Sequence, residues 1–205
     1  MQVPKKHLPV VGILGIIVIA AAGGGIYYYQ FVVPHNVAAP LHRLIFMTAI
    51  VQEEGGFHIN ETAVLNQTSM PTFTQDKGAN LTGVTYVNYK GDSDNKTISA
   101  HVGDTLTFYI KGINATYPCG SYTDGGTKEC WLSPCNAHGF TISGSVQVLN
   151  GTLGGTCNSP SSAYIPFGKW YSVTVKFTAP GTYSYFCFIV CSVEHGDMNG
   201  NIVVS

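Results

Sequence analysis

Four side chains that can bind a metal ion through sulfur or an imidazole nitrogen lie close together near the C-terminal end of the sequence. Cys187, Cys191, His195 and Met198 follow the pattern Cys-x3-Cys-x3-His-x2-Met. Thiolate, thioether and imidazole ligands suit copper, and the set contains no carboxylate that would favour a hard ion. A strand that ends near Cys187, followed by a tight loop that returns into a strand over Asn201–Val204, would gather all four side chains at one end of a folded domain.

From Gly83 onward the sequence is a series of short β-branched and aromatic runs, bounded by Gly, Asp, Asn and Pro. Runs of about four to eight such residues are typical of strands. Seven or eight of them favour an antiparallel sandwich or a small barrel, so the expected fold class is all-β. The expected strands are Val84–Tyr89, Thr97–Val102, Thr105–Lys111, His138–Ser143, Val146–Leu149, Trp170–Phe177, Thr182–Phe188 and Asn201–Val204.

One further imidazole ligand is expected from His138. It begins a predicted strand, and Gly139 after it lets the backbone pass close to a site. A single thiolate is enough for a mononuclear blue copper site, whereas Cys187 and Cys191, four residues apart, can bridge two copper ions. A disulfide between these two cysteines is the alternative that needs no metal.

The segment Cys187–Met198, together with His138-Gly139-Phe140, resembles the binuclear copper A site of subunit II of haem–copper terminal oxidases. The resemblance covers roughly residues 96–205 and includes the Pro180-Gly181 turn before the ligand strand. It implies a cupredoxin-like Greek-key sandwich that holds two copper ions. A single N-terminal membrane anchor before such a domain is similar to the oxidases whose subunit II has one transmembrane helix.

The resemblance also implies a role for each ligand. Both cysteines would bridge the two coppers, each histidine would bind one copper, and a methionine thioether and a backbone carbonyl would be weak ligands. The implied set is His138, Cys187, Ile189, Cys191, His195 and Met198. An apolar shell that excludes water is expected from Phe186, Phe188, Ile189 and Val190.

A chain of this kind would accept single electrons outside the membrane and pass them to haem in the catalytic subunit I, which reduces oxygen. The sequence shows no nucleophile or proton-transfer constellation of its own, so the oxygen chemistry is assigned to that haem-containing partner. The electron donor would be a small protein, either a cytochrome c or a cupredoxin. Two alternatives stay open: a stand-alone membrane-anchored cupredoxin that shuttles electrons or binds copper, and a surface module whose cysteines all form disulfides.

The sequence departs from the family pattern at three places. Ile189 stands where many oxidase subunits have an acid that also contacts a magnesium ion, so the magnesium site is in doubt. Ser192 stands where glycine is common. The tryptophan-rich strip that receives electrons from cytochrome c is not visible, and only Tyr86 and Tyr89 lie in that region. The usual donor is therefore not assumed.

The N-terminal part is predicted to cross a membrane once. Leu8–Val33 is a stretch of 26 residues without a formally charged side chain, which as a helix would reach about 39 Å across a hydrocarbon core of about 30 Å. Lys5 and Lys6 before it and Tyr27–Tyr29 near its end favour an N-terminus on the inside. A signal peptide cleaved near Ala20–Ala22 is the alternative. Either way, the remaining chain lies on the extracellular or periplasmic side of the cell membrane.

Three segments are expected along the chain. Residues 1–35 form a cytoplasmic tip and the transmembrane anchor, residues 36–82 a juxtamembrane linker, and residues 83–205 the exported copper domain. Within the linker, Leu41–Val51 is apolar but too short to span a bilayer, so it is expected as a strand or a short surface helix. Residues 52–82 are polar and show little periodicity.

Four more cysteines lie in Gly-, Ser- and Thr-rich segments on both sides of His138. In an exported domain they are best explained as two disulfides. Of the three possible connectivities, Cys119–Cys130 with Cys135–Cys157 is favoured. A zinc site is the alternative, and the absence of any Cys-x2-Cys pair disfavours it.

Six asparagines are followed two positions later by threonine, which makes each an N-glycosylation sequon. This number favours a glycosylated, exported surface, and coincidence in a Thr-rich β protein is the alternative. The six are Asn60, Asn66, Asn80, Asn95, Asn114 and Asn150.

Charge excludes one class of partner. The chain has 10 Lys and Arg against 11 Asp and Glu, which gives a net charge of −1. Binding to a phosphate backbone requires a basic excess, so nucleic acid is not expected as a partner. Charged residues make up only 10% of the chain, against roughly 25% in soluble domains, which favours an exported or membrane-bound protein over a cytosolic one.

Overall fold

The computed structural model describes residues 39–67, 69–92, 96–114, 123–124, 127–128, 137–155, 162–192 and 194–205. Residues Pro40–Ser205 form one compact unit. Its described regular structure is strands, with two short 3-10 turns at Gln52–Glu54 and His195–Asp197. The all-β prediction is therefore confirmed. Within the described ranges no helix is long and apolar enough to cross a membrane, and the anchor predicted over Leu8–Val33 lies outside those ranges.

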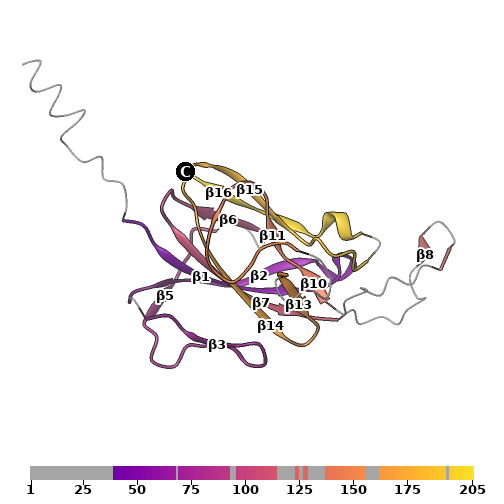
Figure 1. The fold of residues 1–205 in the computed structure, drawn as a ribbon, viewed down its shortest axis with the longest axis horizontal. Helices are drawn as coiled ribbons and strands as arrows, with labels where there is room; N and C mark the ends of the chain where they lie inside the picture. The colour runs from indigo at the N-terminus through magenta and orange to yellow at the C-terminus, as the bar shows by residue number, and fades with distance from the viewer. Residues whose placement is uncertain are drawn as a thin grey trace, which may run out of the picture. The chain divides into compact units, whose positions relative to one another are not determined.

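The larger sheet has six strands in the order β12-β14-β7-β1-β2-β5 (Figure 1). β1 and β7 run parallel, and the other neighbours are antiparallel. The strand bounds are β1 His42–Ala49, β2 Phe57–Leu65, β5 Tyr86–Asn88, β7 Thr105–Gly112, β12 Gln147–Asn150 and β14 Trp170–Lys176.

The smaller sheet has four strands in the order β11-β15-β16-β6, and only β16 and β6 are parallel. Its strands are β6 Thr97–Ala100, β11 Thr141–Ile142, β15 Gly181–Phe186 and β16 Asn199–Val204. Three short pairs complete the described strands: β10 Ala137–Gly139 with β13 Tyr164–Pro166, β3 Thr72–Thr74 with β4 Gly78–Asn80, and β8 Thr123–Asp124 with β9 Thr127–Lys128.

The two larger sheets form a sandwich whose core is a cluster of buried apolar side chains from both. At its centre the Phe140 ring contacts Phe57, with ring centroids 5.6 Å apart, and Phe108, at 5.2 Å. Phe140 stands between β10 and β11, where the chain passes from the small β10–β13 pair into the four-stranded sheet. Because this ring is fully buried, it anchors the preceding residues, His138 and Gly139, at a fixed place.

The outer face of the six-stranded sheet has its own buried cluster, formed by Leu44, Ala63, Leu65 and Tyr109. The Tyr109 ring is stacked between Phe46, at 5.4 Å, and Phe73 of β3, at 5.7 Å. The β3–β4 hairpin thus covers part of this face, which buries the middle of the sheet on both sides.

The structure corrects the predicted linker over residues 36–82. From Pro40 onward these residues belong to the compact unit, and β1 occupies the interior of the six-stranded sheet. A strand buried on both faces is apolar throughout and lacks the alternation that identifies half-buried strands. Arg43, which interrupts the apolar run, is fully buried, pairs with Asp92 at 2.5 Å and lies 3.6 Å from the centre of the Tyr89 ring.

Candidate metal centre

The loop between β15 and β16 carries five of the six expected ligands. β15 ends at Phe186, which pairs with Asn199 at the start of β16. Directly after this pair, the N–H of Cys187 donates to the carbonyl of Met198 at 3.1 Å. The loop therefore leaves and re-enters the sheet at one point, and its last part is the 3-10 turn η4, His195–Asp197.

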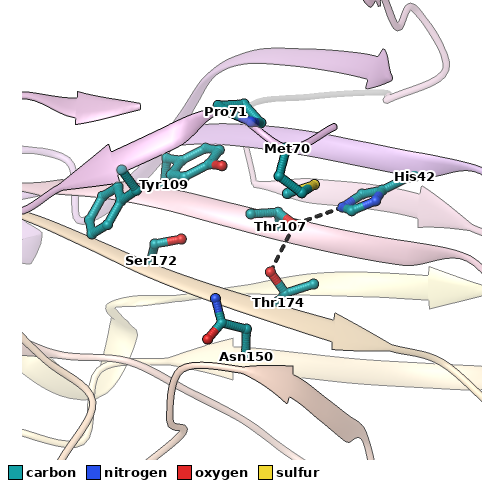
Figure 2. Close-up of a pocket in the computed structure, with 9 residues that line it drawn as sticks. His42, Met70, Pro71, Thr107, Tyr109, Asn150, Ser172 and Thr174 are labelled. Atoms are coloured by element: carbon teal, nitrogen blue, oxygen red, sulfur yellow. Dashed lines mark hydrogen bonds between the residues drawn. The ribbon is translucent and has the colours of Figure 1, made fainter. Parts of the chain in front are cut away.

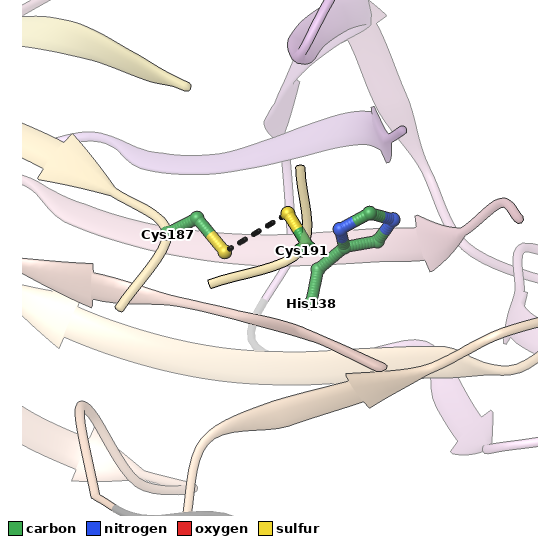
Figure 3. A group of neighbouring side chains, drawn as sticks. All are labelled: His138, Cys187 and Cys191. Carbon is green, nitrogen blue, oxygen red and sulfur yellow. Dashed lines mark hydrogen bonds between the residues drawn. The ribbon is translucent and has the colours of Figure 1, made fainter. Parts of the chain in front are cut away.

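The remaining expected ligand, His138, lies in β10 close to both cysteines of the loop. The ligand atoms of His138, Cys187 and Cys191 all lie within 4.8 Å of one another, and all three residues are buried. Figure 3 shows the two thiols facing each other with the imidazole beside Cys191. The Sγ atoms are 3.9 Å apart, far beyond the roughly 2.05 Å of a disulfide, and both cysteines are free thiols.

Both expected weak ligands lie against the thiols. The Sδ atom of Met198 is 3.8 Å from the Sγ atom of Cys191, and Met198 is completely buried. The carbonyl oxygen of Ile189 is 3.1 Å from the Sγ atom of Cys187. Each cysteine sulfur thus has one additional potential metal ligand beside it.

His195 lies in η4, in the later part of the same loop. It is not one of the three residues grouped within 4.8 Å, yet interaction with Cys187 raises the pKa of its imidazole. His195 is only partly buried, whereas His138 is fully buried. Cys187 therefore lies between a buried imidazole and one near the surface.

The surroundings of Cys187 favour its thiolate, which is the form that binds metals. Together its neighbours lower the pKa of Cys187 to about 3, and the Cys191 thiol is the main cause. Burial acts in the opposite direction, while His138, His195 and the N–H of Gly139 add smaller contributions to the lowering. That N–H donates to the Cys187 sulfur at 3.2 Å.

The imidazole nitrogens provide a test of whether a metal fits. The Nε2 atom of His138 is 2.9 Å from the carbonyl oxygen of Ile113 and donates to it, which leaves Nδ1 with a free lone pair. Among the described residues, the buried Nδ1 atoms of His138 and His195 make no hydrogen bond of normal geometry. Buried polar atoms are normally paired. Two unpaired imidazole nitrogens beside two thiols fit copper as the missing partner.

Packing around His138 is tight. Its ring lies 5.0 Å from the ring of Phe167. A Cβ atom at Gly139 would come within 2.7 Å of the Phe188 ring, so only glycine lets this backbone approach. Neither Ile113 nor Phe167 was predicted as part of the site: Ile113 acts through a backbone carbonyl and Phe167 follows no motif, so their sequence context gives no signal.

The predicted apolar shell is correct for only part of its members. Ile189 is buried and Phe188 is partly buried against the core. Phe186 and Val190 are instead 37% and 46% exposed. Phe186 also lines a shallow surface depression together with Cys187, Phe188 and His195, so this side of the centre is accessible from solvent.

The cysteines predicted to form disulfides lie outside the described residues, and their pairing stays a prediction. They are Cys119, Cys130, Cys135 and Cys157. Of the six sequon asparagines, Asn95 also lies outside the described ranges, and the other five are exposed: Asn60, Asn66, Asn80, Asn114 and Asn150.

Comparison with known proteins gives only distant similarities. No protein-family model and no curated protein matches the sequence. A solved haem–copper terminal oxidase dimer aligns with 98% of this chain and 100% of its own, at 13% identity and a TM-score of 0.38. A multi-copper oxidase from Pediococcus acidilactici aligns over 82% of this chain and 27% of its own, at 16% identity and a TM-score of 0.36. Auracyanin B aligns over 54% of this chain and 78% of its own, at 17% identity and a TM-score of 0.32. These scores are too low to decide function.

Proposed function

We propose that this chain is the copper-binding, electron-entry subunit of a membrane terminal oxidase, built on a cupredoxin-like sandwich with a binuclear copper A centre. The main observation behind this proposal is that two buried free thiols lie 3.9 Å apart, next to an imidazole from β10. A second imidazole, from η4, interacts with Cys187. The all-β sandwich is consistent with this family, and the ligands proposed are His138, Cys187, Ile189, Cys191, His195 and Met198.

When bound, copper supplies a one-electron redox couple that needs no contact with a substrate. The chain's own residues hold the ligands still and exclude water from the inner side of the centre. The hydrogen bond from His138 to the Ile113 carbonyl fixes the ring and its tautomer. The N–H of Gly139 stabilises negative charge on Cys187. Buried Ile189 and Met198 close the inner side of the loop.

The rest of the proposal concerns location and partners. The domain would stand on the extracellular or periplasmic side of the cell membrane, held by a single N-terminal helix whose N-terminus lies inside. Electrons would come from a small donor, a cytochrome c or a cupredoxin, and pass to haem in the catalytic subunit. Phe186 is exposed and lines a depression with His195, and Val190 of the same loop is exposed as well. These apolar side chains support exchange with another protein.

A mononuclear cupredoxin is the second candidate. It is favoured by the grouping of one histidine with two cysteines within 4.8 Å, which together with Met198 could hold a single copper ion. In that case His195 would not be a ligand. The buried, unpaired Nδ1 atom of His195 is the observation that argues for the binuclear site instead.

Copper loading of the full-length, detergent-purified protein tests the proposal. Electron paramagnetic resonance is expected to show one unpaired electron shared by two equivalent copper nuclei, with two coppers per chain by elemental analysis. A hyperfine pattern from one nucleus would favour the mononuclear site, and absence of copper uptake would contradict both. Cys191→Ser should remove the shared-electron signal, while Ser143→Ala, directly after β11, should retain it. Co-purification with a haem-containing membrane subunit tests the assignment to an oxidase separately.

A further inference from the structure

A second recess lies on the face of the six-stranded sheet that is turned away from the core between the sheets (Figure 2). Its volume is about 380 Å³, near the small end of the range for ligand pockets. One wall is polar and carries the hydroxyls of Thr107, Ser172 and Thr174, and the other is apolar and formed by Met70, Pro71 and Phe73. None of these residues takes part in the candidate metal centre.

The polar wall is fixed by hydrogen bonds. The Oγ1 atom of Thr107 lies 2.8 Å from Nε2 of His42 and 3.0 Å from Oγ1 of Thr174. Burial lowers the pKa of His42, so its imidazole favours the neutral form. The wall therefore presents uncharged donors and acceptors beside an apolar surface.

Asn150 lies at the edge of this recess and is the asparagine of the sequon Asn150-Gly151-Thr152. The pairing of β12 with β14 shifts between Val148 and Asn150, which brings Asn150 opposite Thr174. Such a bulge redirects the side chain that follows it. Asn150 is exposed although it lines the recess, so its amide is open to modification.

The orientation of the Asn150 amide is specific. Its Oδ1 atom accepts a hydrogen bond from the N–H of Gly151 at 3.0 Å. In Figure 2 the Nδ2 atom points toward Ser172 and Thr174. Nδ2 is the atom to which an N-linked sugar is joined, so a sugar attached there begins inside the recess.

The recess matches the chemistry of a sugar ring. A pyranose has hydroxyl groups around its edge and a face of C–H groups, so it can hydrogen-bond on one side and pack on the other. Here hydroxyls stand opposite methionine, proline and phenylalanine side chains. The four other described sequon asparagines are exposed as well, but none of them lines this recess.

We propose that Asn150 carries an N-linked oligosaccharide whose first sugar is seated in this recess, between the Ser172 and Thr174 hydroxyls and the wall formed by Met70 and Phe73. The sugar donor would be an oligosaccharide activated as a lipid-linked phosphate ester. The bond from Nδ2 to the anomeric carbon forms, the bond from that carbon to the phosphate oxygen breaks, and Nδ2 gives up one proton. The reaction would take place on the exported chain before β12 pairs with β14.

Peptide mass spectrometry of the full-length protein from its native membranes tests occupancy. A glycan on the peptide that contains Asn150 is the expected result, and an unmodified Asn150 would overturn the proposal whether or not other sequons are used.

Seating in the recess is tested by thermal unfolding of the glycosylated protein. Thr152→Ala removes the sequon but keeps the Asn150 amide. It is expected to lower the melting temperature by about 2–4 °C, which corresponds to a modest loss in the free energy of unfolding for a domain of this length. The matched control, Thr68→Ala, removes the sequon of Asn66, which does not line the recess, and should shift the melting temperature by less than about 1 °C.

A double-mutant cycle distinguishes a seated sugar from one that only covers the surface. Ser172→Ala should lower the melting temperature in the glycosylated chain and have little effect when Thr152→Ala is already present. If Ser172→Ala lowered the melting temperature equally in both backgrounds, the sugar would not be bound in the recess. Copper binding is measured by a different signal. A negative result for the glycan at Asn150 would therefore not contradict the proposed copper function, and a negative result for copper would not contradict the glycan.

Discussion

The two imidazoles of the proposed copper centre stand in very different surroundings. His138 lies in a strand, is fully buried, and is fixed by the Ile113 carbonyl and the Phe167 ring. His195 lies in a single 3-10 turn, is partly buried, and is followed by the exposed Gly196. The strand side thus determines ligand geometry, and the loop side gives the centre its contact with the surface. The proposed exchange of electrons with partner proteins would need both properties.

The strongest test of this difference replaces each histidine by glycine. His138→Gly and His195→Gly should each weaken copper binding by at least about 100-fold, since each removes a ligand. Added free imidazole should restore the copper spectrum in His195→Gly, where the cavity opens to solvent. It should fail in His138→Gly, because Phe167 and the surrounding core block entry. Equal rescue of both variants would contradict the division into a closed and an open side.

Glycine substitutions compare the same two sides without removing a ligand. Gly139→Ala should lower the free energy of unfolding by about 1–3 kcal/mol, because the new Cβ would come within 2.7 Å of the Phe188 ring. Gly196→Ala should change it by less than about 0.5 kcal/mol, since nothing lies within 4 Å of a Cβ at that position. Guanidinium unfolding of the metal-free protein measures both. A larger loss at Gly196 would show that the loop, not the strand, is the tightly packed side.

Thiolate titration measures how each side acts on Cys187. The depressed pKa of Cys187, about 3, means that its thiolate persists at neutral pH and is lost only as the pH falls into the acid range. Cys191→Ser should move the titration to higher pH most, because Cys191 is the main cause of the shift. His195→Gln should move it less, because the imidazole is a smaller cause. Ultraviolet thiolate absorbance of the metal-free protein follows the change, and an unaltered titration in both variants would contradict this order.

The smallest expected effect concerns Ser192 in the loop. Its hydroxyl is buried and has no hydrogen-bond partner among the described residues. Ser192→Ala removes an unpaired polar group, so stability should stay the same or rise by up to about 1 kcal/mol. Ser143 is a matched control because its Oγ atom accepts from the N–H of Ser184 at 2.8 Å, and Ser143→Ala should lower stability by about 1 kcal/mol. Destabilisation by Ser192→Ala would show that this hydroxyl has a partner after all.

The candidate metal loop could be found in the sequence because its proposed ligands lie within twelve residues and have unusual chemistry. His138 could be added because a glycine follows it at the start of an apolar run. The predicted strand His138–Ser143 is in fact two strands, β10 and β11, which belong to different sheets. An apolar run indicates burial, but it does not show that the chain changes sheets in the middle of it.

The first part of the domain was harder to predict. β1 is apolar on both faces, so its pattern also fits a membrane-proximal helix. The reason for its double burial is the β3–β4 hairpin, whose Phe73 covers Tyr109 on the outer face. That contact joins residues far apart in the sequence. The hydrogen bond from His138 to the Ile113 carbonyl was also unpredictable, because any residue at position 113 could supply a backbone oxygen.

The hydrogen bond from Gly139 to Cys187 joins positions 48 residues apart. Contacts between distant positions form late in folding, because the intervening chain must lose entropy before they are made. The loop ligands can meet early, but His138 reaches them only when β10 has docked at the end of the sandwich. A newly made chain would therefore complete the proposed copper ligand set only at the end of folding, and copper loading would report that the domain has matured.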